Sequence, residues 1–131
     1  MSPPGTVLVV DDDPIIVKLL QVNFEMEGYQ VISAADGKEG LARAQGSRPD
    51  LIILDVMMPG IGGLELARTL KSGAETHHIP IILLSAKAQA SDVAAGREIA
   101  DEYITKPFDP LELLDRVAGF LRDGPSNAVE S

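Results

Sequence analysis

Cysteine and tryptophan are both missing from the 131 residues of this chain, and aromatic residues make up only 4% of it. Without cysteine the chain cannot form a disulfide, a thiolate zinc site or a cysteine nucleophile, and a reducing compartment suits it. No apolar run comes near the ~20 residues that span a bilayer, and the first six residues lack the basic and apolar regions of a signal peptide. We therefore expect a cytoplasmic protein.

Basic residues are also few. The chain has 11 Lys and Arg against 20 Asp and Glu, which gives a net charge of -9. A charge of this sign repels the phosphates of nucleic acids and of anionic lipids. The sequence therefore predicts no direct binding to nucleic acid or to a membrane.

What is present is the composition of one soluble domain, with 45% hydrophobic and 24% charged residues. A chain of this length buries roughly two thirds of its unfolded surface on folding, which is enough for a self-supporting core. Residues 1–122 are predicted to form that domain. Residues 123–131 are too polar to add to a core, and we expect a disordered tail or a truncated linker there.

Short apolar segments rich in β-branched residues alternate along the chain with segments of helical spacing. The predicted strands are residues 7–10, 30–33, 51–54, 79–84 and 102–105, and the predicted helices are residues 14–27, 38–45, 63–72, 89–97 and 110–121. Asp13, Pro14 and Gly28 mark the ends of the first helix. Lys18, Lys38 and Lys71 are expected on solvated helix faces. Alternation with short connections predicts an α/β domain, doubly wound around a parallel sheet.

Ligands of an open parallel sheet bind at the carboxyl ends of its strands, and the residues found there are unusual. The first predicted strand is followed by Asp11, Asp12 and Asp13, the third by Asp55, the fourth by Ser85 and the fifth by Lys106. Clustered carboxylates repel one another unless a cation offsets them, and an oxygen-rich set favours Mg²⁺. An Asp carboxylate can accept a phosphoryl group, while an ammonium and a hydroxyl can hold its oxygens.

Four strings carry a resemblance to a known family. They are VLVVDDD at residues 7–13, LIILDVMMPG at residues 51–60 with Gly63, IILLSA at residues 81–86 and YITKPF at residues 103–108. Together they resemble the receiver domain of bacterial two-component response regulators over about residues 6 to 122. The resemblance implies a (βα)5 sandwich with a five-stranded parallel sheet in the flavodoxin-like order 2-1-3-4-5.

The resemblance also implies a role for each site residue. Asp55 would accept a phosphoryl group from a histidine kinase or phosphotransfer protein. Asp12, Asp55 and the backbone carbonyl of Met57 would bind Mg²⁺ directly, and Asp11 would help through water. Ser85 and Lys106 would contact the phosphoryl oxygens. The bond between Lys106 and Pro107 would be cis.

The same resemblance assigns a switch to Ser85 and Tyr103, with the aromatic ring turning inward after phosphorylation. The switched surface would be the fourth helix, fifth strand and fifth helix. It would control a downstream protein or a fused output domain, and the chain would be a monomer or a weak dimer through that face. Two departures stand out. Ser85 replaces the commoner Thr, and the segment from Ser85 to Lys106 is one residue shorter than usual.

Three other interpretations stay open at this stage. A run of three Asp before a helix is often a solvated turn with a helix cap, and Asp13 fits that description. A pseudo-receiver would act as a protein-interaction module without phosphorylation. A small phosphohydrolase resembling the haloacid dehalogenases would use Asp11 as nucleophile and Asp13 as acid. That class needs a further acidic pair that ends a strand after the lysine, and past Lys106 the sequence predicts only a capped helix and a tail.

Overall fold

The computed structural model describes residues 5–57, 62–86, 94, 96 and 98–123. Its elements follow in the order β1 (Thr6–Val10), α1 (Pro14–Met26), β2 (Gln30–Ala34), α2 (Gly37–Ser47), β3 (Leu51–Asp55), α3 (Gly63–Ser72), β4 (Ile81–Ser85), β5 (Glu102–Thr105) and α5 (Pro110–Asp123). Residues 94, 96, 98 and 99 are also helical and belong to a segment before β5, called here the pre-β5 helix. The predicted tail lies outside the described residues except for its first residue.

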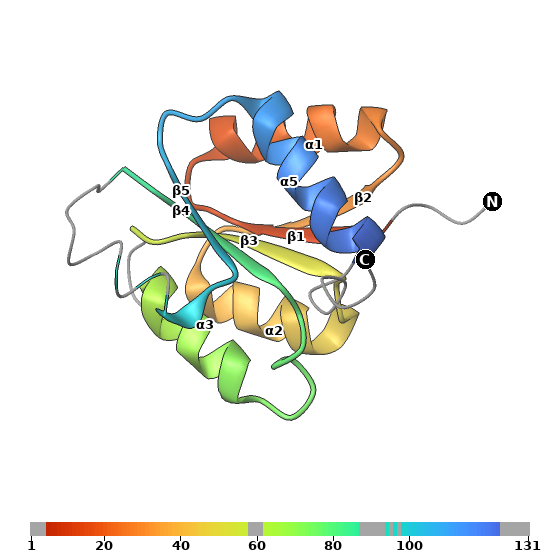
Figure 1. Cartoon of the computed structure of the whole chain (residues 1–131). Helices are drawn as coiled ribbons and strands as arrows, with labels where there is room; N and C mark the ends of the chain where they lie inside the picture. Colours follow the sequence, from red (N-terminus) through yellow and green to blue (C-terminus); the bar gives the residue numbers. More distant parts are fainter. Residues whose placement is uncertain (1–4, 58–61, 87–93, 95, 97, 124–131) are drawn as a thin grey trace.

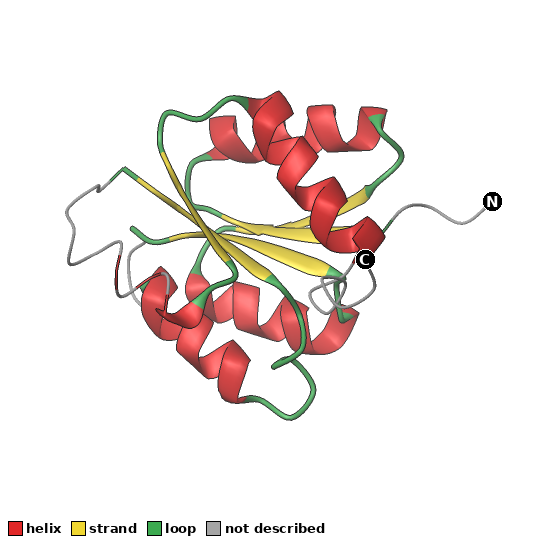
Figure 2. Ribbon diagram, in the orientation of Figure 1, coloured by secondary structure: helices red, strands yellow, loops and turns green. Residues whose placement is uncertain are grey.

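The five strands form one parallel sheet in the order β2-β1-β3-β4-β5, as predicted. Helices α1 and α5 cover one face of this sheet, and α2 and α3 cover the other (Figure 1). The strands therefore form a middle layer between two layers of helices (Figure 2). Among the described residues, no helix is long and apolar enough to cross a membrane.

The caps of α1 follow the sequence prediction. The Asp13 carboxylate accepts a hydrogen bond from the amide of Ile15 at 2.9 Å, and Pro14 occupies the first turn. At the other end, Gly28 has φ +94°, a conformation that side chains disfavour. The amide of Tyr29 then reaches back to the carbonyl of Phe24 at 3.2 Å, which closes the helix.

The structure corrects two points of the sequence prediction, the start of β4 and the surroundings of Lys71. β4 begins at Ile81 rather than residue 79, because the amide of Ile79 is used in a turn with Thr76 and Pro80 has no amide hydrogen. Lys71 is not on a solvated face, and its side chain is only 25% exposed. Its ammonium donates to the carbonyl of Ile79 at 3.0 Å and to Asp101 at 2.9 Å. It therefore ties the end of α3 to the start of β4 and of β5.

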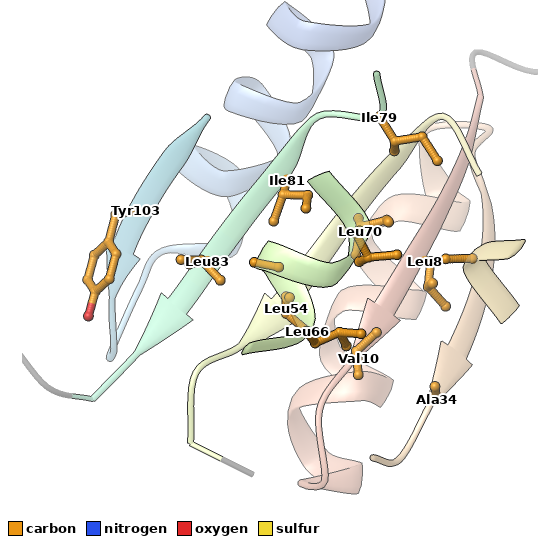
Figure 3. Close-up of a cluster of buried hydrophobic side chains, with 13 residues drawn as sticks. Leu8, Val10, Ala34, Leu54, Leu66, Leu70, Ile79, Ile81, Leu83 and Tyr103 are labelled. Atoms are coloured by element: carbon orange, nitrogen blue, oxygen red, sulfur yellow. The ribbon is translucent and has the colours of Figure 1, made fainter. Parts of the chain in front are cut away.

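The core consists of two clusters, one on each face of the sheet, because successive strand residues point to opposite faces. Leu8, Val10, Leu54 and Leu83 belong to the cluster beneath α2 and α3, of which Figure 3 shows the side chains. The alternate strand residues pack with α1 and α5, and they include Val7, Val9, Ile53, Ile82 and Leu84. β1, β3 and β4 are therefore buried on both sides, which explains their unbroken apolar sequences.

Two glycines of α2 offer a matched test of this packing. A Cβ on Gly40 would lie 2.9 Å from Cγ1 of Val10, whereas one on Gly46 would meet no atom within 4 Å. We expect Gly40→Ala to lower the free energy of unfolding by about 1–3 kcal/mol through overpacking. Gly46→Ala should raise it by about 0.5–1 kcal/mol, since Ala is the better helix former. Urea unfolding checks both, and a loss at Gly46 equal to that at Gly40 would contradict the packing described.

Candidate functional site

The site lies where the carboxyl ends of β1 and β3 meet, because these strands are neighbours in the parallel sheet. Asp11 and Asp12 directly follow β1, and Asp55 is the last residue of β3. One carboxylate oxygen from each of the three lies within 4.8 Å of the others. Asp11 and Asp55 are buried, at 2% and 4% exposure, whereas Asp12 is exposed. The structure thus brings together three carboxylates from two distant stretches of sequence.

Lys106 reaches the same point from β5, two strands further along the sheet. Its Nζ lies 3.3 Å from Oδ2 of Asp11 and 3.5 Å from Oδ1 of Asp55. Its amide donates to the carbonyl of Ser85 at 2.7 Å, which fixes the backbone from which the side chain extends. The peptide bond to Pro107 is cis, as the resemblance implies. One ammonium group therefore contacts both buried carboxylates.

Backbone amides hold the two buried carboxylates in place. The amide of Asp13 donates to Oδ1 of Asp11 at 2.9 Å, and the amide of Met57 donates to Oδ1 of Asp55 at 3.2 Å. Each bond links a carboxylate to the residue two places ahead, so it restricts the side chain without any distant partner. The sequence prediction assigned Met57 a carbonyl ligand and missed its amide, because that bond depends on the turn after β3.

Gly63 allows the start of α3 to pack closely against the backbone of Asp55. A Cβ at Gly63 would overlap the carbonyl oxygen of Asp55 and lie 2.6 Å from Cα of Val56. Its amide donates to the carbonyl of Val56 at 3.1 Å. The first turn of α3 can therefore lie directly against the backbone of Asp55, a role that the motif alone did not reveal.

Ser85 and Tyr103 lie on the two strands beyond β3. Asp55 pairs in register with Leu84, so Ser85 ends β4 one residue past the level of Asp55 and is fully buried. Tyr103 pairs with Leu83 and is 5% exposed. The ring is thus buried in this structure, and its inward turn after phosphorylation stays a prediction of the resemblance.

The electrostatics of the site follow from this burial. The pKa of Asp55 is raised from its ordinary value of 3.8 to about 6, first by burial and then by the negative charge of Asp11. The positive charge of Lys106 and the amide of Met57 oppose this rise. The ionised form is thus unfavourable in the folded chain, and added positive charge would stabilise it.

The carboxylate cluster fits Mg²⁺. Octahedral oxygens 2.0–2.1 Å from this ion lie about 3 to 4 Å apart, close to the spacing of the three carboxylates. The exposed Asp12 leaves a side open to water, which Mg²⁺ usually retains. The donors are all oxygen, so the set does not suit zinc or copper as well.

The sequence pattern of the family described as "Response regulator receiver domain" matches residues 7–118. This chain belongs to that family. Receiver domains of response regulators work with histidine kinases and output domains, and they typically bind Mg²⁺. The membership, the fold and the strand order expected from the sequence are therefore confirmed.

Known relatives agree with this assignment. The chain is 47% identical over 117 residues to the alkaline phosphatase synthesis transcriptional regulatory protein PhoP of Bacillus subtilis, covering 88% of this chain and 48% of that protein. It is 44% identical to the phosphate regulon transcriptional regulatory protein PhoB of Pseudomonas aeruginosa, covering 94% and 55%. The chain thus spans about half the length of these relatives. A putative response regulator from Chloroflexus aurantiacus superposes with a TM-score of 0.85 at 38% identity, covering 91% and 98%.

The raised pKa of Asp55 predicts that its charge weakens the fold. With a pKa of about 6 in the folded chain against 3.8 unfolded, Asp55 costs stability progressively between these pH values and fully above pH 6. We expect Asp55→Asn, without divalent cation, to raise the free energy of unfolding at pH 7.5 by about 1–3 kcal/mol, and about half as much at pH 5.

Asp115→Asn, an exposed change of the same charge on α5, should shift the free energy of unfolding by less than about 0.5 kcal/mol. Urea unfolding at the two pH values in EDTA provides the measurement. If Asp55→Asn does not raise the free energy of unfolding at pH 7.5, or raises it equally at both pH values, the charge of Asp55 does not destabilise the fold.

Proposed function

We propose that this chain is a signalling switch in which Asp55 accepts a phosphoryl group, with Mg²⁺, from a histidine kinase or phosphotransfer protein. The observation that carries the proposal is the meeting of Asp55 with Asp11, Asp12 and Lys106 at one point of the sheet. These residues come from three distant stretches of sequence. Its catalysis is limited to its own phosphorylation and dephosphorylation.

In the transfer step, a carboxylate oxygen of Asp55 attacks the phosphorus of a phosphohistidine. The phosphorus–nitrogen bond breaks, an oxygen–phosphorus bond forms, and the imidazole nitrogen leaves with the electron pair and takes up a proton. With a pKa of about 6, Asp55 is still mostly ionised near pH 7.5 and is a more basic nucleophile than an ordinary Asp. Burial therefore favours the attack.

The surrounding groups balance charge during transfer. Lys106 is already in contact with Asp55 and can shift to the incoming phosphoryl oxygens. The hydroxyl of Ser85, at the end of the neighbouring strand, can donate to another of these oxygens. Asp11, Asp12, Asp55 and the Met57 carbonyl would hold Mg²⁺, which neutralises charge on the phosphoryl group when bound.

The structure argues against the phosphohydrolase interpretation. That class needs an acidic pair that ends a strand after the lysine, and past Lys106 the described part of the chain holds only α5; Oδ1 of Asp13, the assigned acid, caps α1 by accepting the amide of Ile15. The pseudo-receiver interpretation requires a missing or displaced site member. The carboxylates and the lysine are all close enough to act together.

A docking surface for the phosphodonor lies beside the site on α1. Ile15, Leu19, Val22 and Met26 are spaced by four, three and four residues and are 76%, 37%, 44% and 77% exposed. This spacing forms one apolar stripe along a helix. An apolar hollow lined in part by Leu19, Lys106 and Phe108 continues it toward the site. We infer that an amphipathic helix of the phosphodonor packs here.

The output surface of the proposal is the pre-β5 helix, β5 and α5. Arg116 of α5 pairs with Glu102 of β5 at 2.9 Å on this side. Through it the chain would control a downstream protein or a fused output domain, and would remain a monomer or form a weak dimer. DNA binding, which the names of relatives mention, would reside in that output domain, since this chain is strongly acidic.

The phosphorylation itself is tested by intact-mass analysis. Incubation with acetyl phosphate and Mg²⁺ should add one phosphoryl group to the chain, because Asp55 has its charge-balancing partners in place. Asp55→Asn or EDTA should prevent the gain, while Asp115→Asn should leave it unchanged. A mass gain that persists in Asp55→Asn would overturn the acceptor assignment, and no gain in the parent chain would support the pseudo-receiver.

The docking surface is tested by comparing two phosphodonors. Ile15→Glu and Val22→Glu place charge on the exposed stripe, so transfer from a purified histidine kinase that phosphorylates the parent chain should slow by about tenfold or more, or ~1.4 kcal/mol of barrier. Phosphorylation by acetyl phosphate needs no docking and should keep its rate. Equal slowing with both donors would place the defect in the site rather than on α1.

A further inference from the structure

The helical turn at Gly96 lies directly against the ring of Tyr103. A Cβ at Gly96 would overlap Cδ2 of the ring, lie 2.5 Å from Cε2 and lie 3.2 Å from Cδ1 of Leu83. Gly96 is itself buried, and the ring is 5% exposed. Figure 3 shows Tyr103 on β5 at the edge of the core cluster, beside Leu83 on β4. The ring therefore fills space that any side chain at position 96 would need.

The connection from this turn to β5 is short and anchored. The amide of Ala100 donates to the carbonyl of Gly96 at 2.8 Å, which continues the helix almost to the strand. The amide of Asp101 donates to the carbonyl of Ile81, and the carboxylate of Asp101 accepts a hydrogen bond from the amide of Ile81, each at 2.9 Å. Lys71 holds the same carboxylate oxygen of Asp101 at 2.9 Å. The connection is thus anchored to β4 at Asp101, and the hydrogen bond from Ala100 joins Gly96 to that anchored end.

We propose that Gly96 is the residue that admits Tyr103 to its buried position, so that the ring and the pre-β5 helix form one steric unit. With the ring in, the helical turn is held at a fixed distance from β4. With the ring out, the turn faces a void the size of an aromatic side chain, which is unfavourable in a packed core. The helix then has to rearrange.

This coupling deepens the proposed function, and its consequence for signalling rests on the proposed role of Tyr103 as a switch. It identifies the contact by which a change at the end of β4 reaches the output surface. A rotation of the Tyr103 side chain moves the turn at Gly96, because the ring and the turn are in contact and cannot move independently. Close-packed interfaces favour such discrete rearrangements over gradual ones.

The position of the ring can be measured directly because the chain has only two tyrosines. Tyr29 packs against Phe24 on the opposite face of the sheet and serves as an internal reference. We expect 3-fluorotyrosine labelling to give two ¹⁹F signals, assigned with Tyr29→Phe and Tyr103→Phe, both protected from a soluble paramagnetic agent. In Gly96→Ala, the Tyr103 signal should become several-fold more sensitive to the agent while the Tyr29 signal stays unchanged.

Gly119→Ala is the matched control, since a Cβ there would meet no atom within 4 Å, and it should leave both signals unchanged. A second measurement compares urea midpoints in two backgrounds. Gly96→Ala should lower the midpoint of the parent chain. In Tyr103→Ala, where the ring is gone, the same substitution should leave the midpoint unchanged or raise it, because Ala favours the helix.

The outcomes are decisive in both directions. A Tyr103 signal as protected in Gly96→Ala as in the parent, or an equal fall of the midpoint in both backgrounds, would overturn the coupling. If Gly96→Ala alone fails to fold, folding of the double variant with Tyr103→Ala supports the proposal and its failure overturns it. All measurements are made without phosphodonor. A negative result in these measurements therefore does not contradict the acceptor role of Asp55. In the same way, a chain that is not phosphorylated would not contradict the contact of Gly96 with Tyr103.

Discussion

Asp11 and Asp55 are two buried carboxylates held side by side, and the repulsion between them is the constraint around which the site is built. Burial and this repulsion raise the pKa of Asp55, while one ammonium group, that of Lys106, offsets part of the negative charge. The remaining imbalance favours a hard cation at the cluster and, in the proposed function, would make Asp55 a more basic nucleophile than an ordinary Asp. The proposed reactivity and the proposed metal binding would thus have the same physical origin.

The parallel sheet is what makes this arrangement possible. Because β1 and β3 are neighbours and run in the same direction, their last residues fall at the same edge, and Asp12 and Asp55 arrive there without any special loop. Lys106 comes from two strands away and spans the distance with its long side chain. Short backbone hydrogen bonds from Asp13 and Met57 then orient the buried carboxylates. The charged ends of these side chains meet at that edge of the sheet.

Two glycines link the site to the rest of the molecule by close contact. Gly63 brings the first turn of α3 against the backbone of Asp55, and Gly96 brings the pre-β5 helix against the ring of Tyr103. In both places the residue is glycine, which has no side chain to prevent the helix from approaching another part of the chain. The ion pair of Lys71 with Asp101, and the hydrogen bond from the Ile81 amide to Asp101, hold the residue before β5 against α3 and β4. In the proposed switch, such tight packing would carry a change at the sheet edge to the output surface.

The sequence by itself determined the strands, most helix ends and the residue types at the sheet edge, because periodicity, caps such as Asp13 and the position of Gly28 are local properties. It also predicted the family and the set of Asp55, Asp11, Asp12 and Lys106. Tertiary structure decided the rest: where β4 starts, that Lys71 is an anchor rather than a solvated lysine, that the Met57 amide holds Asp55, and that Gly96 faces Tyr103. Lys71 and Asp101 lie 30 residues apart. The turn of Ile79 with Thr76 and the contact of Gly96 with Tyr103 join residues that are near in sequence, but they depend on how the connecting segments turn and pack. Their distances follow from how helices pack on the sheet, which no local pattern encodes.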